Sequence, residues 1–413
     1  MMVPYQIAYG PLSNIIILYI LQINGTVVDA SYAVAVSNIM WIAASAFWGR
    51  MVEIYDKRKI FVASSLLGLA ISLAGIALIK NVLGVIIIYG ILTFMVIANS
   101  MPFNMLIMET NPKDRWAHGF SRLQMLSTIG VVFGYVITAF LSGFLPLDYV
   151  ILMLVPFSII ALIFTKFIHE PTSPFPKLSI LSSIQVLGGR FLSNPLLFIK
   201  IPGFARRGNA SSTNLSASQP ILKKGEYINN LYIAVLVFFI GSTIFNTAFP
   251  AGLTAQGFSN SDVLSVLLVG NIVQAVIFYK SGMLIEKRVK SKVASSALMV
   301  RGLGYISVGI SFILLTNIAL LGASVILYTI AAGIAYAIFY ATFNTMVFEA
   351  VGNEKRGTKL GIYSGFVGFG SFVGAPIAGY LSYYIGYWFA FMAAGAFIIA
   401  TAGVILLGRK SAK

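Results

Sequence analysis

Long apolar runs recur along the whole chain and restrict its folding options more than any other feature. A helix that crosses a bilayer core about 30 Å thick needs roughly 20 apolar residues. A search of the 413 residues gives about twelve such runs, each far longer than the roughly 9–11 residues of a membrane-spanning strand. We therefore predict an all-α integral membrane protein. The predicted spans are 11–28, 31–49, 60–79, 82–108, 120–144, 148–168, 229–250, 262–282, 293–315, 318–348, 358–383 and 385–407.

The composition supports a lipid environment and excludes several classes of site. Apolar residues make up 58% of the chain and charged residues 10%, against about 45–50% and about 25% in soluble proteins. A shift of this size means that the outer surface is apolar too, as lipid requires. Cysteine is absent and His118 and His169 are the two histidines, so disulfides, thiolate metal sites and histidine-rich metal sites are excluded. We expect neither a metal nor a cofactor.

The positions of Lys and Arg predict the orientation in the membrane. Cytoplasmic loops carry an excess of these residues. If the N-terminus is cytoplasmic and the helices alternate, all of the 28 basic residues except Lys80 fall on the cytoplasmic side. This segregation and the attraction of anionic lipid account for the net charge of +16 without nucleic acid. We expect a multi-pass protein of the plasma membrane, with both termini cytoplasmic.

The two ends of the chain repeat each other around a polar middle segment. Aligned without gaps at an offset of 233 residues, the first half meets identical polar residues in the second half. The matched pairs include Asp29 with Asp262, Asn38 with Asn271, Glu53 with Glu286, and Lys57 with Lys290. We predict two six-helix bundles, 1–168 and 229–413, joined by a cytoplasmic linker at 169–228. Parallel repeats of this kind are a transporter architecture, in which the substrate lies near mid-membrane between the halves.

The loop between the second and third spans resembles a motif of the major facilitator superfamily. The family pattern is a Gly, an acid four residues later and a basic cluster, and here it reads Gly49, Glu53, Lys57 and Arg58. Asp56 stands where a second Gly is usual. The second half carries a copy of the motif at Gly282, Glu286, Lys287 and Arg288. The resemblance covers nearly the whole chain and implies the fold of that family, two pseudo-symmetric six-helix bundles.

A weaker family feature is an acid that ends the fourth and tenth spans, followed by an Arg in the loop. Here Glu109 precedes Arg115, and Glu349 precedes Arg356. The resemblance implies that these charges form ion pairs on the inner side that hold the outward-open state. The alternative is that Glu53 and the Lys-rich run form a solvated loop; the second copy in register favours gating.

A glycine and proline pattern bears on the direction of transport. The eleventh span contains Gly370, Gly374, Pro376 and Gly379. This looks like the pattern of exporters in the superfamily, although they carry it in the fifth helix. The predicted fifth span, 120–144, has no proline. The pattern slightly favours export.

The acidic residues bear on ion coupling. All twelve Asp and Glu residues map to helix ends, loops or the linker, and none to the bilayer midplane. Proton relays within membranes usually place Asp, Glu or His there. Carboxylate-based proton coupling at a central site is therefore not supported. Our hypothesis is a facilitator, or coupling through a boundary acid such as Asp29 or Glu109.

Polar residues inside the spans are the candidates for contact with substrate. An amide in lipid needs partners, so these side chains should face the interior. Residues without a counterpart in the other half are the better candidates, whereas the pair Asn38 and Asn271 suits helix contacts or gating. Arg122 and Arg301 either extend to the inner surface or bind an anion, and for Arg301 we favour the former. The cavity candidates are Gln22, Asn24, Asn38, Asn246, Asn271, Gln274, Arg122 and Arg301.

These patterns predict alternating-access transport of a small organic solute by a monomer. The mostly uncharged set of candidates argues against highly charged solutes. The alternative is a transport-inactive membrane receptor or scaffold with the same fold. An ion channel is a weaker reading, because no pore-forming motif is present. An enzyme is not expected, because there is no Gly-rich phosphate loop and no nucleophile beside a base.

Overall fold

The computed structural model describes residues 1–54, 58–99, 116–168, 221–285, 289–351 and 356–411. Within these ranges the chain is helical and contains no strand. The helices are α1 (Met2–Tyr9), α2 (Leu12–Gln22), α3 (Val27–Ile54), α4 (Arg58–Leu78), α5 (Val82–Ile97), α7 (Trp116–Leu141), α8 (Leu147–Phe164), the 3₁₀ turn η2 (Thr165–Phe167), α11 (Ile221–Ala255), α12 (Asn260–Ile285), α13 (Lys290–Leu314), α14 (Asn317–Tyr328), the π-helix η4 (Thr329–Ala335), α15 (Tyr336–Val351), α16 (Arg356–Tyr384) and α17 (Tyr387–Ser411).

These helices confirm the all-α membrane fold. Nine described stretches are long and apolar enough to cross a membrane, and two further apolar helices are shorter. The remaining span is α1 with α2, which are separated by Gly10 and Pro11. Proline has no N–H for the helix ladder, so Pro11 interrupts the helix there. The first span therefore covers 2–22 rather than the predicted 11–28, and α11 starts at Ile221, inside the predicted linker.

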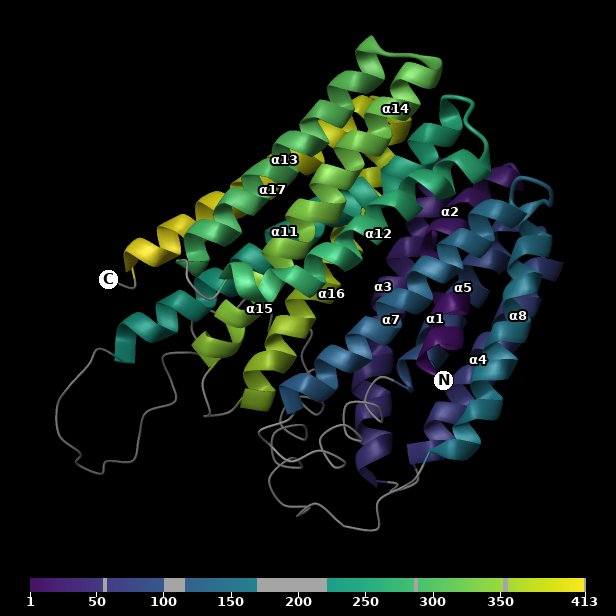
Figure 1. Ribbon diagram of the computed structural model, residues 1–413, viewed down its shortest axis with the longest axis horizontal. Helices are drawn as coiled ribbons and strands as arrows, with labels where there is room; N and C mark the ends of the chain where they lie inside the picture. Colours follow the sequence, from purple (N-terminus) through teal and green to yellow (C-terminus); the bar gives the residue numbers. More distant parts are fainter. Residues whose placement is uncertain (55–57, 100–115, 169–220, 286–288, 352–355, 412–413) are drawn as a thin grey trace.

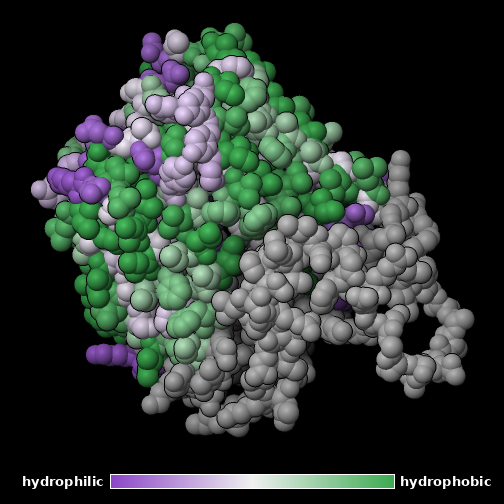
Figure 2. Space-filling model, turned by 180° about the vertical axis from the view of Figure 1, so that it is seen from behind, coloured by the Kyte–Doolittle hydropathy of each residue, from purple (hydrophilic) through white to green (hydrophobic). Residues whose placement is uncertain are grey.

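The outer surface of the helices is apolar. Figure 2 shows hydrophobic residues over most of the described part of the face that it presents. Large side chains such as Leu78, Leu314 and Ile318 are more than 70% exposed. In water this surface would cause aggregation, whereas in lipid it is the expected exterior.

The helices form two groups that lie side by side. Figure 1 shows α1 to α8 (purple to blue) on one side and α11 to α17 (teal to yellow) on the other. Within the first group α4 packs on α8 and α3 on α5, and within the second α11 and α13 pack on α17. The groups meet where α3 contacts α16, α7 contacts α12 and α2 contacts α11. We call the groups the first and the second half.

The internal repeat is visible in the helix caps. Thr26 Oγ1 and its backbone N–H both donate to Asp29 Oδ2, at 2.7 and 2.8 Å. Ser259 Oγ and its backbone N–H donate in the same way to Asp262 Oδ2, at 2.6 and 3.1 Å. In each half the carboxylate thus caps the start of the second span, α3 or α12, where a negative charge is favourable.

The end of the molecule with these caps carries only short connections. They are the segments 23–26, 79–81, 142–146, 256–259, 315–316 and 385–386, and we call this end the short-turn end. Lys80, which the sequence placed on this side, has its Nζ 3.4 Å from Asp148 Oδ2. Its charge is therefore balanced locally.

The two halves contact each other closely at the short-turn end. The hydroxyls of Tyr32 in α3 and Tyr380 in α16 lie 2.6 Å apart. Ser261 Oγ in α12 donates to the Ala139 carbonyl in α7 at 2.7 Å. A Cβ added to Gly379 would lie 2.7 Å from Ser31 Cβ, so only glycine permits this approach of α16 to α3.

Candidate functional site

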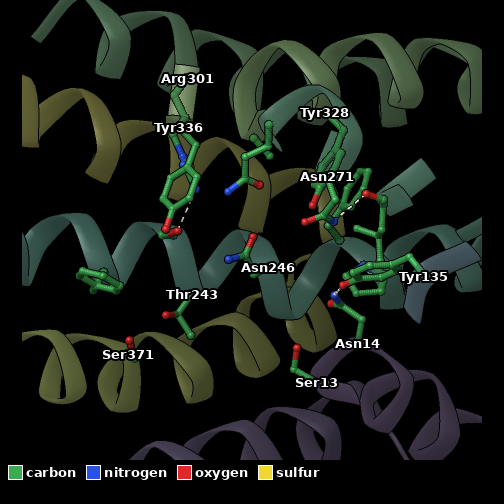
Figure 3. A pocket seen from close by; sticks show the side chains of 17 residues that line it. Ser13, Asn14, Tyr135, Thr243, Asn246, Asn271, Arg301, Tyr328, Tyr336 and Ser371 are labelled. Carbon is green, nitrogen blue, oxygen red and sulfur yellow. Dashed lines mark hydrogen bonds between the residues drawn. The ribbon is translucent and has the colours of Figure 1, made fainter. Parts of the chain in front are cut away.

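A cavity of about 330 Å³ lies between the two halves. It is lined by seventeen residues, which come from α2, α7, α11, α12, α13, α14, η4, α15 and α16 (Figure 3). Three of them, Ser13, Asn14 and Tyr135, belong to the first half. This volume is at the lower end of the range for small-molecule sites, about 300–1,000 Å³. The cavity therefore suits a small solute.

The wall from the first half is a hydrogen-bonded pair. Asn14 Nδ2 in α2 donates to Tyr135 Oη in α7 at 2.5 Å (Figure 3). Small residues bring α1 and α7 together: a Cβ on Gly130 or Gly134 would lie 2.6 or 2.7 Å from backbone carbonyls of Val3 and Ile7. This close packing positions Tyr135 against the cavity.

The wall from the second half carries three amides. Asn246 comes from α11, and Asn271 and Gln274 come from α12. Asn271 Nδ2 donates to the Leu267 carbonyl at 2.8 Å, one helical turn earlier, which leaves its Oδ1 as an acceptor. In Figure 3 Asn246 lies in the middle of the cavity. These amides supply neutral donors and acceptors to whatever occupies the space.

Arg301 of α13 is buried in the same wall, 2% exposed. Its Nη2 donates to Ser242 Oγ at 2.9 Å. The guanidinium carbon lies 4.6 Å from the ring centre of Tyr336 and 5.1 Å from those of Phe238 and Tyr305. Each such cation–π contact contributes about 0.5–2 kcal/mol. Of the two readings of Arg301, extension to the surface, which we favoured, is wrong, because the aromatic rings hold the side chain inside.

A π-helical segment shapes the wall beside Arg301. η4 lies between Tyr328 and Tyr336, and both tyrosines line the cavity together with Ala332. π-Helical turns are rare and occur frequently at functional sites. Tyr328 packs its ring against Gly270 of α12, where any Cβ would clash at 2.3 Å. The local sequence, rich in Ala and Gly, gave no signal for this segment.

Three of the predicted cavity residues lie elsewhere. Gln22 and Asn24 are exposed at the short-turn end, where Gln22 Oε1 accepts the Leu147 N–H at 3.1 Å and Asn24 adopts a positive φ of 64°. Asn38 donates to the Val34 carbonyl at 2.9 Å and is not among the residues that line the cavity. The expectation for Gln22 and Asn24 fails because their polar groups end a helix rather than lie within one. The side chain of Arg122 lies outside the described residues.

Several cavity residues were not predicted from the sequence. Asn14 lies within an apolar run, as the other amides do, and the same reasoning could have found it. Hydroxyl residues are too common in membrane helices to be singled out. They are Ser13, Tyr135, Ser242, Thr243, Tyr328, Tyr336 and Ser371.

Most of the predicted gating charges lie outside the described residues. These are Asp56, Lys57, Glu109, Arg115, Glu286, Lys287 and Arg288, together with the side chains of Glu53, Arg58 and Arg356. The surroundings of the motif glycines Gly49 and Gly282 lie outside the description as well. Glu349 is described, and it forms an ion pair with Lys290 of α13. Both residues belong to the second half and are partly exposed, so this pair contributes at most about 1 kcal/mol. It joins helices within one half.

The glycines of α16 have a packing role. A Cβ on Gly370 would lie 2.7 Å from the Leu236 carbonyl of α11, and one on Gly374 would lie 2.6 Å from the Ile240 carbonyl. Gly379 approaches α3 at the other end of the helix. The pattern that favoured export is thus accounted for by contacts of α16 with α11 and α3.

Comparisons with known proteins agree with this architecture. The family model described as Major Facilitator Superfamily matches residues 3–334 and 231–413. No curated protein sequence matches the chain. The solved structure of a mutant nucleoside transporter NupG is 14% identical, with a TM-score of 0.73 over 98% of this chain and 97% of that chain.

Two further solved structures share the fold. The xylose transporter XylE from E. coli, in a partially occluded inward-open conformation, is 14% identical, with a TM-score of 0.67 over 98% of each chain. A POT family transporter in complex with a thioalcohol-conjugated peptide is 12% identical, with a TM-score of 0.73 over 100% of this chain and 95% of that chain. With the family match over its whole length, the chain belongs to the Major Facilitator Superfamily.

Proposed function

We propose that this protein carries a small organic solute across the plasma membrane by alternating access, with the short-turn end facing outward. Its family and fold are those of multi-pass membrane transporters of small solutes. The observation that carries the proposal is the polar cavity between the two halves, lined from both, in a protein whose outer surface is apolar. Rocking of the halves about this cavity would expose it to each side in turn.

The contacts at the short-turn end support a closure that can reverse. They consist of hydrogen bonds such as Tyr32 with Tyr380 and of small-residue packing such as Gly379 on α3. A single hydrogen bond contributes about 0.5–1.5 kcal/mol. A ligand with differential affinity for the two states can shift such an equilibrium. The bundles 1–168 and 229–413 are the moving parts in this proposal, and we expect the monomer to suffice.

We propose facilitated transport without proton coupling at Asp29. Its carboxylate is committed to the cap of α3, as Asp262 is to that of α12. The change Asp29→Asn should lower the free energy of unfolding by about 1 kcal/mol or less, and Asp262→Asn should do the same. Uptake into proteoliposomes should be unaffected by an imposed pH gradient in the wild type and in both variants. A pH-driven uptake that disappears in Asp29→Asn alone would contradict the facilitator.

The absence of cysteine permits a test of alternating access that needs no known substrate. The variant Asn246→Cys places one thiol in the middle of the cavity. In a transporter this thiol should react with a small membrane-impermeant methanethiosulfonate added to either face of the membrane. Ser158→Cys is the matched control, because Ser158 is buried in α8 away from the cavity and should not react.

The same experiment separates the two functions considered for this fold. Reaction of Asn246→Cys from both faces supports the transporter. Reaction from neither face, in protein that is otherwise folded, would favour a transport-inactive receptor or scaffold. Flux of a solute panel into proteoliposomes completes the test; a pentose and a nucleoside belong in it, because XylE and NupG are named for such solutes.

A further inference from the structure

The cavity contains a cation whose charge is balanced by no carboxylate of the described residues. Of the seventeen described lining residues, Arg301 is the only charged one. The described acids Asp29, Asp148, Asp262 and Glu349 lie at helix ends and have partners there. Arg301 therefore carries a net positive charge into a space that is otherwise neutral.

The guanidinium also has hydrogen-bonding capacity left over. Nη2 donates to Ser242, whereas Nε and Nη1 have no hydrogen-bond partner among the described residues, although both atoms are buried. Buried donors in native proteins are normally paired, and a buried unpaired charge is costlier still. Three aromatic rings offset part of the lost hydration, but a ring face accepts no strong hydrogen bond. The Tyr305 hydroxyl, which is itself buried beside the guanidinium, is a nearby protein acceptor. A charged acceptor in the cavity would satisfy the remaining donors and balance the charge.

The position of Arg301 is occupied by different residues in the two halves. Arg301 aligns with Ala70 of α4, which is 7% exposed and cannot carry charge. The cation is thus no part of the repeated framework, such as the caps at Asp29 and Asp262. A feature present in one half of a duplicated fold is better explained by what binds there than by what holds the fold together.

We propose that Arg301 binds the carboxylate of a small organic monoanion, which names the substrate class and so rests on the function proposed above. Guanidinium N–H groups match the geometry of carboxylate and phosphate oxygens. One positive charge balances one carboxylate, whereas a phosphate monoester, at close to two negative charges, would leave the cavity negative. The neutral body of the ligand then extends past Asn246 toward Asn14 and Tyr135, which lie at the opposite end of the cavity from Arg301 (Figure 3).

The test measures the thermal stability of the purified full chain with matched probes. The probes are sodium benzoate and sodium lactate, their neutral amides benzamide and lactamide, and inorganic phosphate. We expect the carboxylates to raise the midpoint of unfolding more than the amides do. In Arg301→Gln the affinity for the carboxylates should fall about ten- to hundred-fold, which is the worth of hydrogen bonds to a charged group. In Arg301→Lys the affinity for the carboxylates should fall less, since lysine keeps the positive charge and lacks only the planar guanidinium group.

The unliganded variants separate binding from structural support. If Arg301 serves the ligand, Arg301→Gln removes an unbalanced buried charge, and its midpoint without ligand should equal or exceed that of the wild type. A lower midpoint would mean that the cation holds the fold, and would overturn the proposal. Four other results would also overturn it. The carboxylates and the amides could stabilise the protein equally, or no carboxylate could stabilise it, or phosphate alone could do so. The fourth is an Arg301→Gln variant that keeps the full affinity for the carboxylates.

Failure of this inference is distinguishable from failure of transport. If the thiol of Asn246→Cys reacts from both faces but any of the overturning results is found, the transport proposal stands and only the proposed anion substrate is rejected. If the thiol reacts from neither face, the transport proposal is rejected regardless of the results with the anions. Access from both faces and a carboxylate effect that depends on Arg301 supports both.

Discussion

Oxidation of the double variant Gly143→Cys/Ser261→Cys should abolish transport. Gly143 lies in the turn after α7, and Ser261 lies in the first turn of α12, so the pair joins the two halves at the short-turn end. A Cβ added to Gly143 lies 3.8 Å from Ser261 Cβ, and the mean separation in disulfides is about 3.8 Å. A disulfide there would prevent the halves from separating at that end. Flux into proteoliposomes should fall to the level of protein-free vesicles and recover when a reductant is added.

The controls for this lock come from the chain itself. With no native cysteine, any disulfide in the oxidised protein is the engineered one. Each single-cysteine variant should transport before and after oxidation. Full flux in protein whose cross-link has been verified by electrophoretic mobility would show that the halves need not separate at the short-turn end. That result would contradict the proposal that the two halves move apart during transport.

The change Ala332→Trp should also reduce flux to background, for a different reason. Ala332 lies in the π-helix η4 and faces the cavity. An indole placed there would occupy much of a space of about 330 Å³ and displace the solute. Because the side chain enters open space, the strain on the fold should not exceed the about 1–3 kcal/mol typical of overpacking. Flux and thermal midpoint are measured on the same preparation.

Ile330→Trp is the matched control for the filled cavity. Ile330 lies two residues earlier in the same π-helix and is 39% exposed on the outer surface. This variant should transport normally, since an aromatic side chain is compatible with lipid contact. Loss of flux in both variants would indicate damage to η4, and normal flux in a folded Ala332→Trp would place the solute path elsewhere.

Much of the fold was accessible from the sequence because lipid imposes a simple rule. Apolar length alone predicts spans such as 262–282 and 385–407; α12 contains the first, and α17 begins two residues into the second. The rule failed where local chemistry decides the ends of helices. Pro11 interrupts the first span, and Thr26 with Asp29 starts α3 earlier than its apolar residues suggest. Capping is a contact between neighbouring side chains and backbone, and hydropathy does not record it.

The site was harder to predict from the sequence, because the type of a residue does not indicate which way its side chain faces. Asn38 and Asn271 occupy equivalent positions and make equivalent backbone hydrogen bonds, yet only Asn271 lines the cavity. The difference arises from how each half packs. Arg301 was placed near the surface by its length and flexibility, and the rings of Tyr336 and its neighbours reverse that expectation. Rings distant in sequence cannot be assigned to one cation without the tertiary structure.

The unequal contribution of the halves to the cavity has a consequence for the transport cycle. Ser13, Asn14 and Tyr135 are the first half's share of the lining, and the second half supplies the rest, including Arg301 and the three amides. A bound solute would therefore stay attached to the second half during the cycle, while the first half moves across the cavity and opens or closes access to it. Substitutions of Asn14 or Tyr135 should then alter how long the passage stays open to each compartment, and substitutions in α11 or α12 should alter how tightly the cargo is held.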